Sequence, residues 1–336
     1  MNQQAPPVGL PIEVRGLTKR FGTVRAVDDL SFDVAPGRVT GFLGPNGSGK
    51  TTTLRMALGL VAADAGTATI GGQPYVRHER PAAVVGASLD ATFHPGRTAR
   101  GHLSTVAPLV GADSARTDEV LELVGLADAA DRKVGGFSLG MRQRLGLAAT
   151  LLGDPGVLIL DEPANGLDPQ GIIWLRDLLR HLARQGRTVL VSSHVLAEVQ
   201  ATVDDVVVIA GGRLVHASPL ADLMALDESF VRLAGPDLDA LARAATEAGW
   251  QVEGDGAALR VRGATAAEVG GAAFRAGLEV HALTSVGASL EETFLRLVGG
   301  ELLGTVPQRG DGSAGTPRQP GAGSSHPGTA NPEVAS

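Results

Sequence analysis

The sequence contains no cysteine, only three lysines and few aromatic residues, which make up 3% of the chain. The lack of cysteine excludes disulfides, cysteine-ligated zinc and thiol catalysis within this chain. No run approaches the roughly 18 consecutive apolar residues that a membrane helix needs, and residues 1–10 lack the charged and apolar regions of a secretory signal. We therefore expect a cytoplasmic protein that needs a membrane partner for any work at a membrane.

The chain also lacks the excess of basic residues that is typical of general nucleic-acid binders. It has 29 lysines and arginines against 36 acidic residues, a net charge of −7, which disfavours nucleic acid as a partner. Hydrophobic residues make up 43% and charged residues 19%, as in a folded globular protein. The length of 336 residues is about twice the ~150 residues of a typical domain and favours two domains.

Short apolar runs that alternate with helical patterns predict a mostly parallel α/β sheet in the first part of the chain. We expect strands at 12–17, 30–34, 39–43, 157–160, 188–191 and 206–210. We expect helices from residue 50 onward, at 169–184 and at 195–203. Between the halves, residues 97–152 have helical spacing almost throughout, with loops at 111–116 and 131–137.

A second unit follows, with the order of elements typical of a ferredoxin-like α+β module. We expect strands at 230–233, 250–253, 258–261 and 278–283 and helices at 238–248, 264–276 and 290–297. The remaining residues, 304–336, contain no Leu, Ile or Phe. Since such a segment cannot bury enough apolar surface to order itself, we expect a disordered tail.

The strongest motif is a complete G-x-x-x-x-G-K-[ST] phosphate-binding loop between an apolar strand and a helix. It comprises Gly44, Pro45, Asn46, Gly47, Ser48, Gly49, Lys50 and Thr51, followed by Thr52. The glycines let successive backbone N–H groups converge on phosphates, with the positive end of the helix behind them. Lys50 then reaches the β- and γ-phosphates, and Thr51 is placed for Mg²⁺. A Rossmann dinucleotide site does not fit, because no third glycine has the required spacing.

A second motif is the apolar strand 157–160 that ends in two carboxylates, Asp161 and Glu162. This edge of an α/β sheet is where ligands bind. Asp161 suits a hydrated Mg²⁺, and Glu162 suits a base that polarises water. The two motifs together predict an ATP- or GTP-hydrolysing or phosphate-transferring protein, which leaves GTPases, small-molecule kinases and recombination-type ATPases open. The GTPase is disfavoured because no Asn is followed by Lys, as the base-reading Asn-Lys-x-Asp motif requires.

Residues 137–144, Phe-Ser-Leu-Gly-Met-Arg-Gln-Arg, distinguish these classes. Taken alone, Ser138 is an ordinary helix N-cap. The segment nevertheless resembles the signature LSGGQ-x-Q-R of the ATP-binding cassette (ABC) family, with Ser138 and Gly140 matching its serine and second glycine. Leu139 replaces the first glycine, and Met141 replaces the glutamine. The resemblance implies a P-loop ABC ATPase core with a helical signature subdomain at about 97–153.

Three further positions match family motifs in the expected order, and a fourth departs from its motif. Asp168 matches the aspartate of the D-loop, His194 the switch histidine that contacts the γ-phosphate, and Phe21 the aromatic residue that stacks on adenine. Asp90 stands where the family has the Q-loop glutamine; it can still meet Mg²⁺ or its water, but it lacks the amide donor. The resemblance implies ATP and Mg²⁺ as cofactors and two copies that enclose ATP, each signature completing the partner's site.

The same resemblance implies the organisation of the chain and its role. We expect an N-terminal extension at 1–11, an ABC ATP-binding domain at 12–227, an α+β accessory domain at 228–303 and the tail. One cassette with this appended domain looks like the ATPase subunit of an ABC-2 type exporter of the daunorubicin- or bacitracin-resistance kind, on the inner face of the membrane with a separate permease. The alternative is a soluble cassette ATPase acting on DNA or ribosomes, which is disfavoured because coiled-coil insertions and a second cassette are missing.

Overall fold

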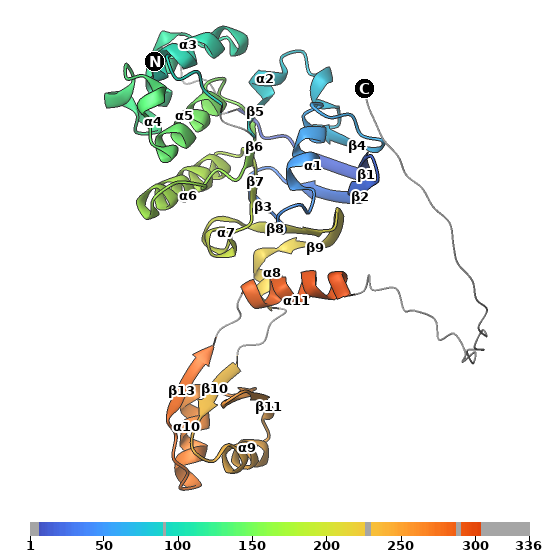
Figure 1. The fold of residues 1–336 in the computed structure, drawn as a ribbon, viewed down its shortest axis with the longest axis vertical. Coiled ribbons are helices and arrows are strands. Elements are labelled where there is room, and N and C mark those ends of the chain that lie inside the picture. The colour runs from blue at the N-terminus through green and yellow to red at the C-terminus, as the bar shows by residue number, and fades with distance from the viewer. Residues whose placement is uncertain (1–6, 90–91, 226–229, 287–289, 304–336) are drawn as a thin grey trace, which may run out of the picture. The chain divides into compact units, whose positions relative to one another are not determined.

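The computed structural model describes residues 7–89, 92–225, 230–286 and 290–303 (Figure 1). The predictions for Asp90 and for the tail at 304–336 therefore lie outside the described residues. Within the described part of the chain, no helix is both long enough and apolar enough to cross a membrane.

The core of the nucleotide-binding part is a six-stranded sheet with the strand order β5-β6-β7-β3-β8-β9. The first five strands pair in parallel, and β9 is antiparallel to β8. In chain order they are β3 (Val39–Leu43), β5 (Val85–Ser88), β6 (Val157–Asp161), β7 (Thr188–Ser193), β8 (Asp205–Ala210) and β9 (Arg213–Pro219). The mostly parallel sheet is confirmed, but β9 was missed because its residues are half-buried or exposed and give little apolar signal.

Both faces of this sheet are covered, which explains why its central strands are continuous apolar runs. Successive side chains point to opposite faces: Val157 and Ile159 belong to one buried cluster, and Leu158 and Leu160 to another. On one side lie α5 (Leu139–Leu151), α6 (Pro169–Arg184) and α7 (Leu196–Thr202). On the other lie α1 (Lys50–Ala57) and an antiparallel sheet (Figure 1).

The antiparallel sheet has the order β2-β1-β4. Its strands are β1 (Ile12–Phe21), β2 (Val24–Val34) and β4 (Ala65–Ile70), so β1 and β2 are longer than predicted and β4 was missed. Only Ile70 of β4 is fully buried, which explains the weak apolar pattern of that strand. Residues before β1 are also held in place, since the Thr188 hydroxyl donates to the Leu10 carbonyl at 2.7 Å.

The helical region contains α3 (Ala99–Val110), α4 (Ser114–Leu123) and α5, with single-turn 3₁₀ helices at Ala127–Ala129 and Val134–Gly136. Its helices begin at side-chain caps, Thr98, Asp113 and Ser138. The expected loop at 111–116 is therefore wrong in its second half, because the Asp113 cap starts a helix at Ser114. Short helices α2 (Pro81–Val84) and α8 (Leu220–Ala225) and a 3₁₀ turn at Tyr75–Arg77 complete this part.

The C-terminal elements are β10 (Phe230–Ala234), α9 (Leu238–Glu247), β11 (Gln251–Asp255), β12 (Ala258–Arg262), α10 (Ala266–Arg275), β13 (Ala282–Val286) and α11 (Leu290–Leu303). The strands form an antiparallel sheet of order β11-β12-β10-β13, as the predicted element order requires. The prediction of a strand at 278–283 is wrong, because β13 pairs with β10 from Ala282 to Val286. Leu290 and Val298 of α11 are buried in the cluster that contains β8, so this helix does not share the core of the C-terminal sheet.

Candidate functional site

The phosphate loop joins β3 to α1, and its glycines are required by the local backbone. Gly47 and Gly49 have φ values of +81° and +103°, in the region that favours glycine. A Cβ on Gly49 would lie 2.4 Å from the Ala26 carbonyl oxygen, and one on Gly44 would lie 2.4 Å from Ser48 Oγ. The loop is thus packed against neighbouring backbone and could not accept side chains at these two positions.

Lys50 lies at the start of α1 and is only 6% exposed. Its ammonium donates to the Gly44 carbonyl at 2.6 Å and to the Pro45 carbonyl at 3.4 Å. The Nζ atom is also 3.6 Å from Glu162 Oε1. A buried cation with these partners is held between the loop and the end of β6, where phosphate oxygens could replace the carbonyls.

Thr51 and Asp161 are brought together as the sequence predicted. The Thr51 hydroxyl donates to Asp161 Oδ2 at 2.6 Å, and the Ser192 hydroxyl donates to the other carboxylate oxygen. Hydroxyl and carboxylate oxygens are the donors that Mg²⁺ prefers, so Thr51 and Asp161 fit a magnesium site. Sequence reasoning missed the role of Ser192; its position at the end of the strand before His194 was the available signal.

Glu162 is held in an unusual backbone conformation, with φ of +50°. Non-glycine residues rarely adopt this region, and they do so mainly at functional sites. Its N–H donates to the Ser192 carbonyl at 3.2 Å and to Ser192 Oγ at 3.0 Å, while His194 Nδ1 and Glu162 Oε2 are 2.8 Å apart. The Glu162 carboxylate therefore contacts His194 through one oxygen and lies near the Lys50 ammonium with the other.

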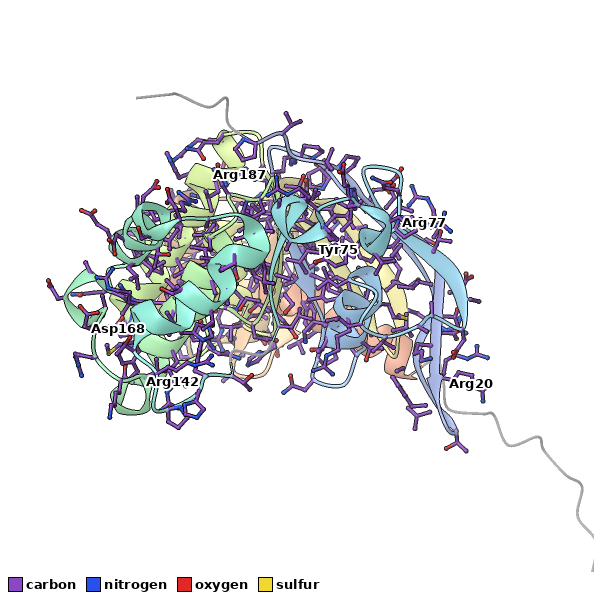
Figure 2. All side chains as sticks on the ribbon, turned by 90° about the horizontal axis from the view of Figure 1, so that it is seen from above. Arg20, Tyr75, Arg77, Arg142, Asp168 and Arg187 are labelled. Carbon is purple, nitrogen blue, oxygen red and sulfur yellow. The ribbon has the colours of Figure 1, made fainter. Side chains whose placement is uncertain are left out.

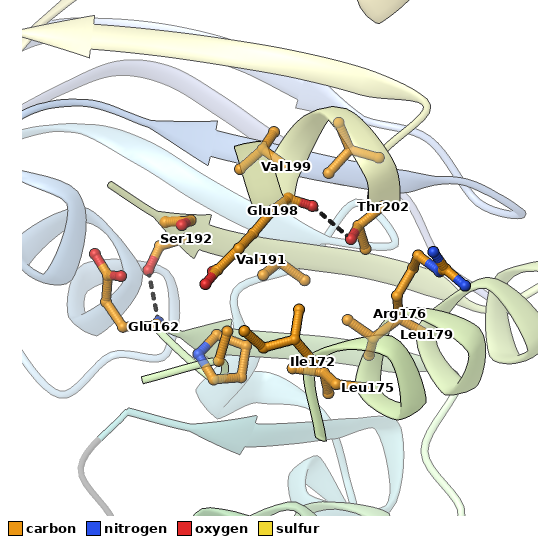
Figure 3. Close-up of a pocket in the computed structure, with 14 residues that line it drawn as sticks. Glu162, Ile172, Leu175, Arg176, Leu179, Val191, Ser192, Glu198, Val199 and Thr202 are labelled. Atoms are coloured by element: carbon orange, nitrogen blue, oxygen red, sulfur yellow. Dashed lines mark hydrogen bonds between the residues drawn. The ribbon is translucent and has the colours of Figure 1, made fainter. Parts of the chain in front are cut away.

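Behind Glu162 lies a mostly apolar pocket between α6 and α7 (Figure 3). Its apolar wall includes Ile172, Leu175, Leu179, Val191, Val199 and Val203. Glu198 extends from α7 toward the side of the pocket on which Glu162 lies. Burial raises the pKa of Glu198; the positive charge of His194 opposes this rise and the Glu162 carboxylate adds to it. Glu162 thus has a second carboxylate as a neighbour, which sequence reasoning did not predict.

The turn between β8 and β9 supports the phosphate loop through the backbone. The Gly212 N–H donates to the Ser48 carbonyl at 3.0 Å, and the Asp28 N–H donates to the Gly212 carbonyl at 2.9 Å. Asp28 in turn pairs with Arg25 at 2.6 Å and Arg213 at 2.5 Å. Burial alone would raise the pKa of Asp28, but the hydrogen bonds from the two arginines outweigh it and lower the pKa. No motif in the sequence signalled these supporting residues.

The signature and the D-loop lie together. The Ser138 hydroxyl accepts from the Met141 N–H at 3.2 Å and caps α5, and Asp168 accepts from the Gly171 N–H at 2.8 Å and caps α6. One hollow is lined by Ser138, Leu139, Gly140, Met141 and Asp168. Among the described residues, none from the phosphate loop lines this hollow, so the signature and the loop belong to different parts of the surface.

Phe21 ends β1 with 50% of its surface exposed. The Lys19 ammonium lies 5.5 Å from the centre of its ring. An exposed ring next to the start of β2 is accessible to a flat ligand. Strand β5 (Val85–Ser88) ends just before Asp90, which lies outside the described residues.

Comparison with known proteins places this architecture in one family. The family model described as ABC transporter matches residues 27–165, and a domain of unknown function matches 229–291. The chain is 36% identical over 303 residues to the bacitracin transport ATP-binding protein BcrA of Bacillus licheniformis, covering 87% of this chain and 99% of that protein. It is also 36% identical over 323 residues to the Nod factor export ATP-binding protein I of Ralstonia nicotianae, covering 89% and 98%.

A solved ATP-binding subunit of an ABC transporter has a similar fold, with a TM-score of 0.58 and 26% identity over 64% of this chain and 92% of that one. The similarity to BcrA extends over nearly the whole of that relative, and the structure brings the phosphate loop together with Asp161 and Glu162. The chain therefore belongs to the ABC transporter family, as a subunit that binds and hydrolyses ATP.

Proposed function

We propose that this chain is the ATPase subunit of an ABC-2 type exporter and works on the cytoplasmic face of the membrane with a separate permease. Support comes from the two relatives that it spans almost completely, one named for bacitracin transport and one for Nod factor export. A drug, a peptide antibiotic or a lipid-like molecule is the substrate class consistent with these names.

ATP binds at the phosphate loop in this proposal. Phe21 stacks on adenine, the backbone N–H groups of residues 46–52 surround the phosphates, and Lys50 neutralises the β- and γ-phosphates. The observation that carries the assignment is the buried Lys50, whose ammonium lies 3.6 Å from Glu162 at the junction of the two motifs.

Thr51 and Asp161 hold Mg²⁺, which when bound offsets the negative charge of the phosphates. Asp90 is the proposed further contact to the metal or its water. Glu162 takes the role of the base that orients and polarises the attacking water, and His194 contacts the γ-phosphate. The hydrogen bond between His194 and Glu162, 2.8 Å long, supports a shared task for these two side chains. Catalysis then rests on positioning and charge stabilisation.

Two copies form the complete enzyme. Ser138 to Met141 and Asp168 lie on a hollow apart from the phosphate loop, so they can act on the nucleotide of a partner copy. The capped N-terminus of α5 supplies a positive helix end to that nucleotide. Each of the two ATP molecules then lies between the phosphate loop of one copy and the signature of the other.

The export role is tested with the complex. The chain is co-purified with an ABC-2 type permease that lacks a cassette of its own and is encoded beside it, and ATP hydrolysis is measured in vesicles with and without bacitracin. We expect the wild-type chain to associate stably with the permease and its ATP hydrolysis to be stimulated by substrate. A chain that never associates with such a permease, yet hydrolyses ATP, would contradict the export role alone.

Phe21→Ala should raise the KM for ATP about fivefold and leave kcat nearly unchanged. A stacking contact contributes about 1 kcal/mol and acts equally on the ground and transition states. Steady-state kinetics measure KM and kcat of this variant. Phe21→Trp is the rescuing variant, and Phe274→Ala is the control, because Phe274 is another exposed ring, 84% accessible. A fall in kcat without a change in KM would contradict adenine stacking.

A further inference from the structure

Leu139 is one of two departures from the family signature, with Met141, that the proposed function leaves unexplained. It is the first residue of α5, directly after the Ser138 cap, and 57% of its surface is exposed. A leucine at such a position neither fills the core nor contacts the phosphate loop of its own copy. Its contacts instead lie on the D-loop, residues 165–168.

Gly166 of the D-loop fits Leu139 closely. Its φ is +80°, and a Cβ at Gly166 would lie 2.2 Å from Leu139 Cδ2 and 2.4 Å from Leu139 Cγ. Real Cβ atoms do not approach other atoms so closely, so a side chain at 166 would displace the exposed Leu139 side chain from this position. The next residue of the helix adds a second contact, because a Cβ on Gly140 would lie 3.1 Å from the Gly166 carbonyl oxygen.

A third contact joins α5 to α6, the helix that follows the D-loop. The Arg144 guanidinium of α5 lies 4.6 Å from the ring centre of Trp174 in α6, a cation–π distance. Arg144 also donates to the Val124 carbonyl at 3.2 Å, which fixes its side chain. Helix α5 therefore contacts the chain before Asp168, at Gly166, and after it, at Trp174. Figure 2 shows Asp168 and Arg142 of α5 on the same side of the molecule.

We propose that Leu139 is a positioning residue that locks the D-loop to the signature of the same copy through Gly166. Ser138 and Asp168 then approach the partner's nucleotide as one rigid body. Two independent loops would each lose conformational freedom when the two copies close, whereas a preformed unit has lost it beforehand. This contact explains why the signature has a leucine at 139 in place of glycine: Gly166 leaves room for the Leu139 side chain. This inference rests on the proposed two-copy site.

The test is a double-mutant cycle with two readouts. ATP hydrolysis is measured in the otherwise wild-type chain, and ATP-dependent self-association is measured in the Glu162→Gln background. Leu139→Ala removes the contact, Gly166→Ala adds a methyl group that collides with Leu139, and the double variant removes the collision. Gly186→Ala is the matched control for backbone strain, because Gly186 also has a positive φ, +90°, but no atom within 4 Å of the Cβ position. Leu139→Met keeps an apolar side chain of similar reach.

We expect Gly166→Ala to lower hydrolysis and self-association about tenfold, well beyond Gly186→Ala. The double variant keeps the backbone strain of alanine at a φ of +80°, so it should fall below Leu139→Ala by no more than the loss that Gly186→Ala shows. Leu139→Met should retain most of the wild-type values. MgATP binding to single copies, measured by titration at low protein concentration, should change less than about twofold, because Lys50, Thr51 and Asp161 are untouched.

Losses that multiply in the double variant would overturn the lock, and so would a Gly166→Ala effect no larger than that of Gly186→Ala. If single-copy ATP binding fell as much as hydrolysis and self-association, Leu139 would have only a structural role, and this result would also overturn the lock. The Glu162→Gln chain with both residues intact is the reference. If that chain does not self-associate with ATP, the two-copy site itself fails, and this outcome is distinct from failure of the lock.

Discussion

Lys50→Ala is expected to weaken ATP binding by at least about thirtyfold and to remove measurable hydrolysis. Truncating one member of a buried, hydrogen-bonded charge pair costs at least about 2 kcal/mol, and the Lys50 ammonium is the only one that an observed contact brings near the phosphate loop in the described part of the chain. Its loss also leaves Glu162 without the cation 3.6 Å away. Equilibrium titration with a fluorescent ATP analogue and a phosphate-release assay measure the two effects.

Lys133→Ala is the matched control, since it removes another of the three lysines from an exposed position. That variant should bind and hydrolyse ATP like the wild type. Nearly unchanged turnover in Lys50→Ala would mean that the phosphate loop is not the catalytic site.

Glu162→Gln is expected to keep MgATP binding and to lower hydrolysis at least about 100-fold. Glutamine preserves the size and reach of the side chain but removes the charge that polarises water, and loss of a general base costs at least about this factor. Lys50, Thr51 and Asp161 remain in place, so binding persists. Single-turnover hydrolysis and nucleotide titration on the same preparation separate the two quantities.

Glu198→Gln is the control for this variant, because it removes the other carboxylate that lines the same pocket. It should lower hydrolysis far less than Glu162→Gln does. A Glu162→Gln chain with normal turnover, or a Glu198→Gln chain with the larger loss, would take the base role away from Glu162.

Unhydrolysed ATP should also hold two Glu162→Gln copies together. With ATP this variant is expected to sediment as a dimer, while the wild type with ADP stays monomeric. Adding Ser138→Arg should abolish the dimer, since a bulky cation displaces the capped end of α5 from the partner's phosphates. A Glu162→Gln chain that remains monomeric at saturating ATP would count against the two-copy arrangement.

Elements buried on both faces were predictable from the sequence, whereas two largely exposed strands, β4 and β9, were not. The runs at β3, β6, β7 and β8 are apolar because each strand is covered by helices on one side and by strands or α1 on the other. By contrast, β4 and β9 alternate weakly and are held mainly by pairing with β1 and β8. The position of β13 depends on its register with β10, a long-range contact that no local pattern contains.

Some residues of the candidate site were likewise predictable from the sequence, and others were not. Lys50, Thr51, Asp161 and Glu162 belong to two local motifs, and the parallel sheet brings these motifs to one edge. The position of Ser192 before His194 was the only sequence signal for its role, and its bond to Asp161 could not be predicted. The support of Ser48 by the Gly212 turn had no sequence signal, and both contacts join segments far apart in the chain. The positive φ of Glu162 likewise follows from tertiary hydrogen bonds and not from its neighbours in the sequence.

Hydrolysis of each ATP between two copies can be tested by mixing two inactive chains. The Glu162→Gln chain lacks the base but keeps its signature, and the Ser138→Arg chain keeps Lys50 and Glu162 but has a blocked signature. A two-fold dimer of one chain of each kind contains one intact composite site. We expect hydrolysis, very low in either chain alone, to appear on mixing and to rise with the fraction of mixed dimers. A mixture that stays as inactive as its components would contradict hydrolysis at a site shared by two copies.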